Sequence, residues 1–426
     1  MSTTAVPDVA VAQVDEGFWT RTRKVGLVLS ALGLLATVLF GALATGEQAR
    51  FTLSEDSAGA ALEIHGTVGA VLFGLIALAT GAALLVGVPK RWFVPLLAVG
   101  LVAFVLSFLC WQVSAAPTGQ NFMPLVNIVR GTFLLALPLI FGALAGVLCE
   151  RSGVVNVAIE GQLLMGAFSG ALFGSISGSV WVGLVAAAIG GAFISLLLAV
   201  FCIRYLVDQV VMGIVLNLLA VGITGFLYER LMQTDAARYN SAPRFSNWEI
   251  PLLSDIPVLG PALFRSSIFL YLALLLVLVI HIALFRTRWG LRTRSVGEHP
   301  TAADTLGVKV LRVRYRNVLL AGVVAGIGGA SYTLALYSFT KNMIGGKGFI
   351  ALAALIFGRW SPTGALLAAL FFGFADQLAT YLGAINSIIP GQFLAMLPYL
   401  ATILAVAGLV GRVRAPAADG KPYIKG

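Results

Sequence analysis

The chain has 426 residues, of which 59% are hydrophobic and only 11% are charged. A soluble domain carries about 25% charged residues, so this composition excludes an ordinary soluble enzyme. The net charge is +10, but eight of the 28 Lys and Arg residues lie between Arg286 and Arg316 and most others lie at the ends of apolar runs. This placement follows the positive-inside rule of membrane proteins and argues against nucleic-acid binding.

The apolar runs are close to the length that crosses about 30 Å of hydrocarbon, and they are continuous rather than alternating. Only helices and closed barrels satisfy every backbone group in lipid, and continuous runs favour helices. We therefore predict an all-α polytopic transmembrane helical bundle with about 10–12 membrane segments. The expected spans are 25–45, 66–88, 92–112, 131–149, 158–176, 179–201, 207–230, 267–286, 317–337, 348–358, 363–381 and 393–411.

The segment 348–358 is too short to cross a bilayer alone. Glycines precede it at Gly345, Gly346 and Gly348, and Pro362 follows it closely. A half-helix or re-entrant element is expected here, and such elements often line a substrate path.

Counting charges in the loops gives the orientation. With the N-terminus in the cytoplasm, the acidic 46–65 loop falls outside, and the basic 286–316 loop and the basic C-terminal tail fall inside. We therefore expect both termini to be cytoplasmic. This orientation requires that the short segment 348–358 be counted as one crossing of the membrane. The long 231–266 loop falls outside, and it is predicted to be either a docking surface for a partner or a solvated loop with an interfacial helix.

No motif for catalysis is present: the chain lacks a GxxxxGK[ST] phosphate loop, an HExxH pair and a GxSxG elbow. The three cysteines, Cys110, Cys149 and Cys202, lie in or beside apolar runs without metal-ligand spacing and are interpreted as packing residues. We expect no catalytic residue, no metal and no cofactor bound by this chain. The few ionisable residues expected within the hydrocarbon are Glu160, Asp208, His281 and Asp376.

The stretch from Glu150 to Gln162 separates two apolar helices and contains Asn156 and Glu160, one helical turn apart. Two interpretations stay open. The two side chains line a polar path, or Asn156 caps the following helix and Glu160 lies near the interface; a capping role is favoured for Asn156.

The basic loop contains Pro300, which suits the first turn of a helix, and Gly307, which suits its end. A short helix is therefore predicted over about 300–306. Its small residues Ala302 and Ala303 would let it lie closely in a groove on another protein, although an ordinary basic connecting loop is the alternative.

Four stretches resemble one family: Glu150–Gln162, Val296–Val308, Gly346–Ala354 and Leu397–Gly411. The chain is similar to permease subunits of ABC importers of the simple-sugar and branched-chain amino-acid class, most of all to nucleoside-type permeases. The resemblance runs from about residue 120 to the C-terminus. It implies four parts: a cytoplasmic tail 1–24, an extra three-span segment 25–115, a type II-like permease domain 116–412 with coupling loop 287–316, and a cytoplasmic tail 413–426.

The resemblance implies that the basic loop is a coupling helix that docks on an ABC ATPase subunit. The docking residues it assigns are Gly297, Glu298, Pro300, Ala302, Ala303, Asp304 and Gly307. It also implies a second homologous permease (or a second copy), an extracytoplasmic substrate-binding lipoprotein, and use of ATP and Mg²⁺ by the ATPase alone. The expected cargo is a nucleoside or a related simple sugar, moved by alternating access.

Polar or aromatic residues near the broken helices are candidates for the substrate path. They are Asn156, Glu160, Asn217, Phe339, Asn342 and Phe349. Asn217 has an alternative as an interhelical hydrogen bond, and Phe339 as an interfacial loop aromatic. The rival functions are a self-sufficient secondary carrier or channel for a small polar solute, and a membrane scaffold without cargo.

Overall fold

The computed structural model describes residues 20–53, 61–117, 121–256, 258–336, 338–384, 392–393, 396, 399 and 414–425. The predicted last span, 393–411, therefore lies outside the described residues except at Phe393, Met396 and Tyr399. The described chain is mainly helical and forms two compact units, the first holding the elements up to α4 and the second those from α5 onward.

The first unit contains three long helices and a three-stranded sheet with strand order β2-β1-β3. Glycines bring α1 and α3 together: a Cβ on Gly33 would lie 2.3 Å from the Leu78 nitrogen, so only glycine permits this approach. The elements are α1 (Arg21–Leu35), the π-helical turn η1 (Ala36–Phe40), α2 (Gly41–Leu43), β1 (Gln48–Thr52), β2 (Ala61–His65), α3 (Gly66–Val86), α4 (Lys90–Ser114) and β3 (Phe122–Pro124).

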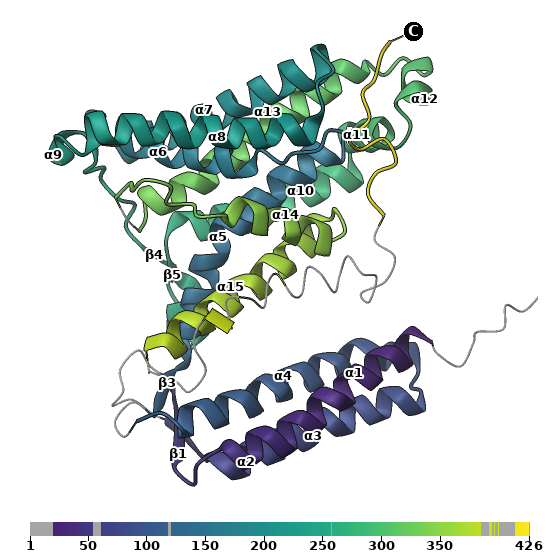
Figure 1. Ribbon diagram of the computed structural model, residues 1–426, viewed down its shortest axis with the longest axis vertical. Coiled ribbons are helices and arrows are strands. Elements are labelled where there is room, and N and C mark those ends of the chain that lie inside the picture. Colours follow the sequence, from purple (N-terminus) through teal and green to yellow (C-terminus); the bar gives the residue numbers. More distant parts are fainter. Residues whose placement is uncertain are drawn as a thin grey trace, which may run out of the picture. The chain divides into compact units, whose positions relative to one another are not determined.

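The second unit is a helical bundle followed by the C-terminal segment 414–425 (Figure 1). Its elements are α5 (Leu125–Glu150), α6 (Ile159–Ser177), α7 (Val180–Ala199), η2 (Val200–Arg204), α8 (Gln209–Leu227), η3 (Tyr228–Met232), α9 (Ala236–Tyr239), β4 (Trp248–Glu249), η4 (Gly260–Phe264), β5 (Arg265–Ser266), α10 (Ile268–Arg286), α11 (Arg288–Glu298), α12 (Pro300–Thr305), α13 (Val310–Thr333), α14 (Lys347–Phe357) and α15 (Pro362–Ala384).

Helices α6, α7 and α13 lie side by side (Figure 1). Small residues at their contacts let the backbones approach closely. A Cβ on Gly326 would lie 2.2 Å from the Ala187 carbonyl oxygen, and one on Gly329 would lie 1.9 Å from the Leu163 oxygen. Such contacts replace the hydrophobic effect, which does not drive helix association in lipid. Among the eight candidate membrane spans of the described residues, α5 is the most buried, since 83% of the residues in its most apolar stretch are buried.

Eight of the described helices are long and apolar enough to cross a membrane. This confirms a polytopic helical membrane protein. Helices α6 and α13, which were also expected as spans, have 19 and 24 residues but more polar sequences. The short element is confirmed as α14, an 11-residue helix.

Two details differ from expectation. Helix α13 begins at Val310 rather than at 317, because Val310 and Val313 are buried in an apolar cluster that extends the helix beyond its apolar part. The 231–266 loop contains the single turn α9, the turn η4 and an antiparallel pair in which Trp248 faces Ser266. Its proposed role as a docking surface stays a prediction.

Candidate functional site

The break between α5 and α6 is an irregular segment whose backbone is held by side chains of α8. The Val155 N–H donates to Gln209 Oε1 at 2.6 Å. Asn217 accepts from the Gly161 N–H at 2.8 Å and donates to the Val157 oxygen at 2.9 Å. These bonds satisfy backbone groups that a broken helix leaves without partners. The alternative interpretation of Asn217, an interhelical hydrogen bond, fits this geometry.

Asn156 is fully buried in this break and does not cap α6. Its side-chain amide exchanges two hydrogen bonds of 3.1 Å with Gln162, which also donates to Ser195 Oγ at 2.8 Å. The N-cap of α6 is Ala158. The predicted cap is therefore wrong. So is the shared helical face of Asn156 and Glu160, because Asn156 precedes the helix. The network instead ties the break to α6 and α7.

Glu160 caps a different helix from its own. Its two carboxylate oxygens accept the N–H groups of Gly346 and Gly348 at 2.8 and 2.6 Å, at the N-terminus of α14. A carboxylate is favourable there, because the helix dipole and the free N–H groups point at it. A Cβ on Gly348 would lie 2.4 Å from the Glu160 nitrogen, so glycine is needed for the approach. Glu160 is 5% exposed, so its carboxylate lies inside the bundle. A position near the membrane interface and a role in a polar path both stay predictions.

Lys347, the first residue of α14, forms an ion pair with Asp376 of α15. The two side chains are 21% and 15% exposed. Asp376 was expected within the hydrocarbon, but Lys347 was not predicted as its partner. The pairing could have been predicted, because one span contains a single acid, the half-helix begins with a single lysine, and charges within the membrane pair with one another.

The C-terminal end of α14 is also held by the break. Trp360, just after the helix, donates its indole N–H to the buried Glu150 carboxylate at 2.5 Å. Arg151 donates from Nε to the Trp360 carbonyl oxygen at 2.8 Å. Arg359 and Trp360 adopt left-handed φ values of 55° and 52°, which turn the chain sharply before α15. Residues 150–160 thus hold both ends of the half-helix.

The predicted short helix of the basic loop is confirmed as α12, with Pro300 in its first turn and Gly307 at φ +81° after it. Its two alanines point in opposite directions. Ala303 is 3% exposed and packs in an apolar cluster within the chain, whereas Ala302 is exposed. Gly297 is also buried: a Cβ there would lie 2.3 Å from the Arg151 oxygen. Ala303 and Gly297 therefore do not form an outward docking surface.

The outer side of α12 carries a residue that the sequence analysis missed. Leu306, directly after the helix, is 83% exposed. A single exposed apolar side chain is common on protein surfaces, so Leu306 becomes a candidate contact only through its position beside the helix that the resemblance assigns to docking. Leu306 could have been noticed in the sequence, because it directly precedes Gly307, the predicted end of the short helix. Glu298 is exposed, and Asp304 and Pro300 are partly exposed beside it.

The remaining path candidates do not gather around α14. Phe339 is fully buried between Phe168 and Tyr228, at ring-centroid distances of 5.3 and 5.8 Å, so it is neither an interfacial aromatic nor exposed to a path. Asn342 is exposed and has a φ of 55°. Phe349 of α14 is 48% exposed. Asn156, Glu160 and Asn217 all form hydrogen bonds at the break, and Phe349 follows Gly348, whose N–H binds Glu160.

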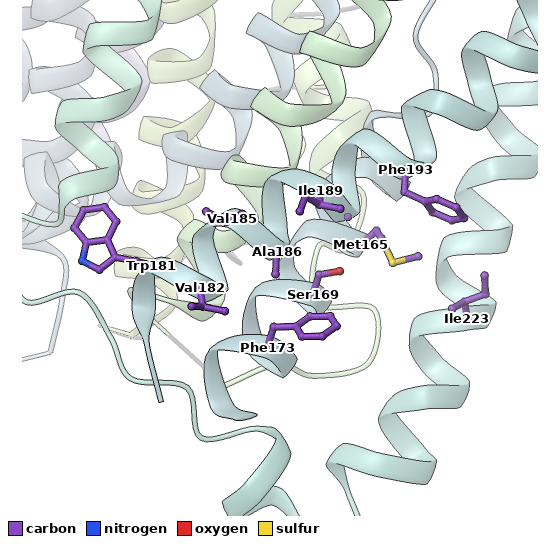
Figure 2. Close-up of a pocket in the computed structure, with 11 residues that line it drawn as sticks. Met165, Ser169, Phe173, Trp181, Val182, Val185, Ala186, Ile189, Phe193 and Ile223 are labelled. Atoms are coloured by element: carbon purple, nitrogen blue, oxygen red, sulfur yellow. The ribbon is translucent and has the colours of Figure 1, made fainter. Parts of the chain in front are cut away.

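A groove of about 880 Å³ lies elsewhere, along α6, α7 and α8. Figure 2 shows Trp181, Phe193, Phe173 and Ile223 around it. Ser169 and the indole N–H of Trp181 are the polar side-chain groups among its described lining residues, and the rest of the lining is apolar, so few hydrogen-bonding groups face a polar solute there.

Comparison with known proteins identifies the family. The family described as branched-chain amino acid transport system / permease component matches residues 128–410. The chain belongs to this permease family. Its matched region begins in α5 and includes the break, the coupling loop and the half-helix, while α1 to α4 precede it.

Several curated permeases are similar to the chain. The guanosine ABC transporter permease protein NupQ of Bacillus subtilis is 46% identical over 70% of this chain and 97% of its own length. The nucleoside ABC transporter permease protein NupC of Lactococcus lactis subsp. cremoris is 43% identical over 70% and 96%. The putative glucose ABC transporter permease protein TsgC13 of Haloferax volcanii is 32% identical over 67% and 92%.

Within this permease family the subunits are not catalytic themselves. Among the described residues no group of three or more His, Cys, Asp or Glu side chains could hold a metal ion.

Proposed function

We propose that the chain is the membrane permease subunit of an ATP-driven ABC importer of nucleosides. The observation that carries the proposal is the similarity to permeases named for guanosine and for nucleosides, at 46% and 43% identity over nearly their whole length. The half-helix α14, held at both ends by residues 150–160, supports the proposal, because broken helices of this kind often line the substrate path of transporters.

The coupling loop is the proposed contact with a separate ABC ATPase subunit, which uses ATP and Mg²⁺. The exposed surface of Ala302, Leu306, Glu298 and Asp304 supports this contact, whereas Gly297 and Ala303 support α12 from within. Positive charge around the loop supports a cytoplasmic location for the loop and for both termini.

The cargo is proposed to be polar and uncharged. Near α14 the acidic side chains already have partners: Glu160 accepts two backbone N–H groups, and Asp376 pairs with Lys347. A charged cargo would call for a fixed counter-charge in the membrane. A nucleoside satisfies this condition, as does a simple sugar.

The complete importer is proposed to contain a second permease, either a homologue or another copy, and an extracytoplasmic substrate-binding lipoprotein. It would lie in the plasma membrane of a bacterium. A self-sufficient carrier or channel is the alternative, and it differs in its energy source: an ATPase drives the importer, whereas an ion gradient drives a secondary carrier.

Reconstitution into liposomes with the cognate ATPase, the second permease and the binding protein tests the proposal. Import of labelled guanosine is expected only with ATP and all subunits. We expect Leu306→Glu to abolish ATPase binding and import, because it puts a charge into an apolar contact. Leu252→Glu, at a position 86% exposed in the 231–266 loop, is the matched control for ATPase binding, because that loop is expected on the opposite side of the membrane. Guanosine uptake without the ATPase, driven by an ion gradient, would contradict the proposal.

A further inference from the structure

The described C-terminal segment 414–425 lies against the coupling loop. Figure 1 shows it, in yellow, passing α11. The Ala418 N–H donates to the Gly297 carbonyl oxygen at 2.9 Å, and the Ala417 N–H donates to Glu298 Oε2 at 3.2 Å. Both acceptors lie at the end of α11, directly before α12. The segment is therefore attached to the loop through its backbone.

Tyr423, near the C-terminal end of the segment, packs against the buried side of α12. Its side chain is 7% exposed and packs with Ala303 of α12, Val296 of α11 and Val310 and Val313 of α13. Its hydroxyl group hydrogen-bonds with the Asp304 carboxylate of α12. A helix of six residues has too few internal hydrogen bonds to be stable alone. The tail thus supplies much of the apolar support that α12 needs.

Between these two contacts the segment reaches the break that holds α14. Arg314 is 2% exposed and donates from Nη1 to the Lys421 oxygen at 3.0 Å. Asp419 hydrogen-bonds with Glu150, the same carboxylate that accepts from Trp360. Gly153 leaves room for this meeting: its φ is +83°, and a Cβ would lie 2.9 Å from Arg314 Nη2 and 3.1 Å from the Ala418 oxygen.

We infer that residues 414–425 form a strap that positions the coupling helix and passes its displacement to the half-helix. The route runs from α12 through Tyr423 and Asp419 to Glu150, and from Glu150 through Trp360 to the C-terminal end of α14. The inference rests on the proposed function, because it assigns the link between ATPase movement and the membrane path.

Tyr423→Ala tests the strap in proteoliposomes that hold the complete importer. We expect nucleoside import to fall about tenfold while the ATPase stays bound and hydrolyses ATP, because loss of a buried aromatic side chain exceeds the free energy of a tenfold change. ATP hydrolysed per nucleoside imported should rise in proportion. Ile424→Ala, at the adjacent position that is 74% exposed, should match the wild type.

Ala418→Pro is the second variant, since it removes the N–H donated to Gly297 and keeps Tyr423. It should raise the ATP consumed per nucleoside in the same way, and it decides the matter if Tyr423→Ala does not fold. An unchanged ratio in folded, ATPase-bound variants would overturn the strap while wild-type import still supports the proposed function. A wild-type complex that imports nothing with ATP would instead refute the proposed function.

Discussion

The two ends of the half-helix α14 are held by the same break but by different chemistry. At the N-terminal end the Glu160 carboxylate binds two backbone N–H groups and has no described bond to any further element. At the C-terminal end Glu150 binds Trp360 and also Asp419 of the tail. The first end is built as a fixed anchor. The C-terminal end is connected through Trp360, Glu150 and the tail to the coupling helix.

Removing the anchor tests the first half of the comparison and should have the largest effect. Glu160→Ala leaves the buried Gly348 N–H and the partly buried Gly346 N–H without acceptors, and a buried unsatisfied donor costs about 1–3 kcal/mol. We expect a clearly lower unfolding temperature in detergent and loss of nucleoside import. Glu229→Ala is the control, because its ion pair with Lys341 has side chains that are 53% and 56% exposed, and exposed ion pairs contribute little to stability. Equal effects of the two substitutions would show that Glu160 is no anchor.

Loosening the other end should have a smaller effect on stability and a distinct effect on coupling. Trp360→Phe keeps an aromatic ring and removes the N–H that Glu150 accepts, at a cost of about 1–3 kcal/mol. We expect more ATP to be consumed per nucleoside, with modest loss of stability. Trp181→Phe, at a position 59% exposed, is the control. If Trp360→Phe lowers import and ATP hydrolysis in the same proportion, the C-terminal end does not transmit coupling.

The smallest effect concerns pH at the tail. Burial, and next the charge of Glu150, raise the pKa of Asp419 from its ordinary 3.8 to about 8, while Arg314 opposes the rise. The docked tail thus prefers neutral Asp419. Docking is favoured most below pH 3.8 and weakens as the pH rises toward about 8, since only the released tail ionises in that window.

Chymotrypsin cleavage after Tyr423, which is buried in the docked tail, measures this release. The cleavage rate of the wild type relative to Asp419→Asn should rise between about pH 6 and pH 8, because asparagine stays neutral. Asp255→Asn, at a side chain 75% exposed, is the control. A ratio that does not change with pH would show that Asp419 is not buried against Glu150.

Local patterns in the sequence predicted the parts of this site but not their partners. Pro300 and Gly307 mark α12 because one suits a first helical turn and the other a left-handed end. The short apolar run between glycines and Pro362 marks α14. Asn156 misled, because a residue typical of helix caps is used here to bind Gln162 across the break.

Composition, run length and the placement of charge by themselves determined a polytopic helical membrane protein with a half-helix and a short helix in its basic loop. Those features follow from bilayer thickness and from backbone preferences, which act over a few residues. Only the tertiary structure decided that Glu160 binds residues 346 and 348, that Ala303 faces inward, and that the tail lies under α12. Glu160 and its partners are more than 100 residues apart in sequence, and so are the tail and α12; Ala303 packs both with neighbouring residues and with Tyr423 of the tail. Packing and burial select such partners, and no local pattern encodes them.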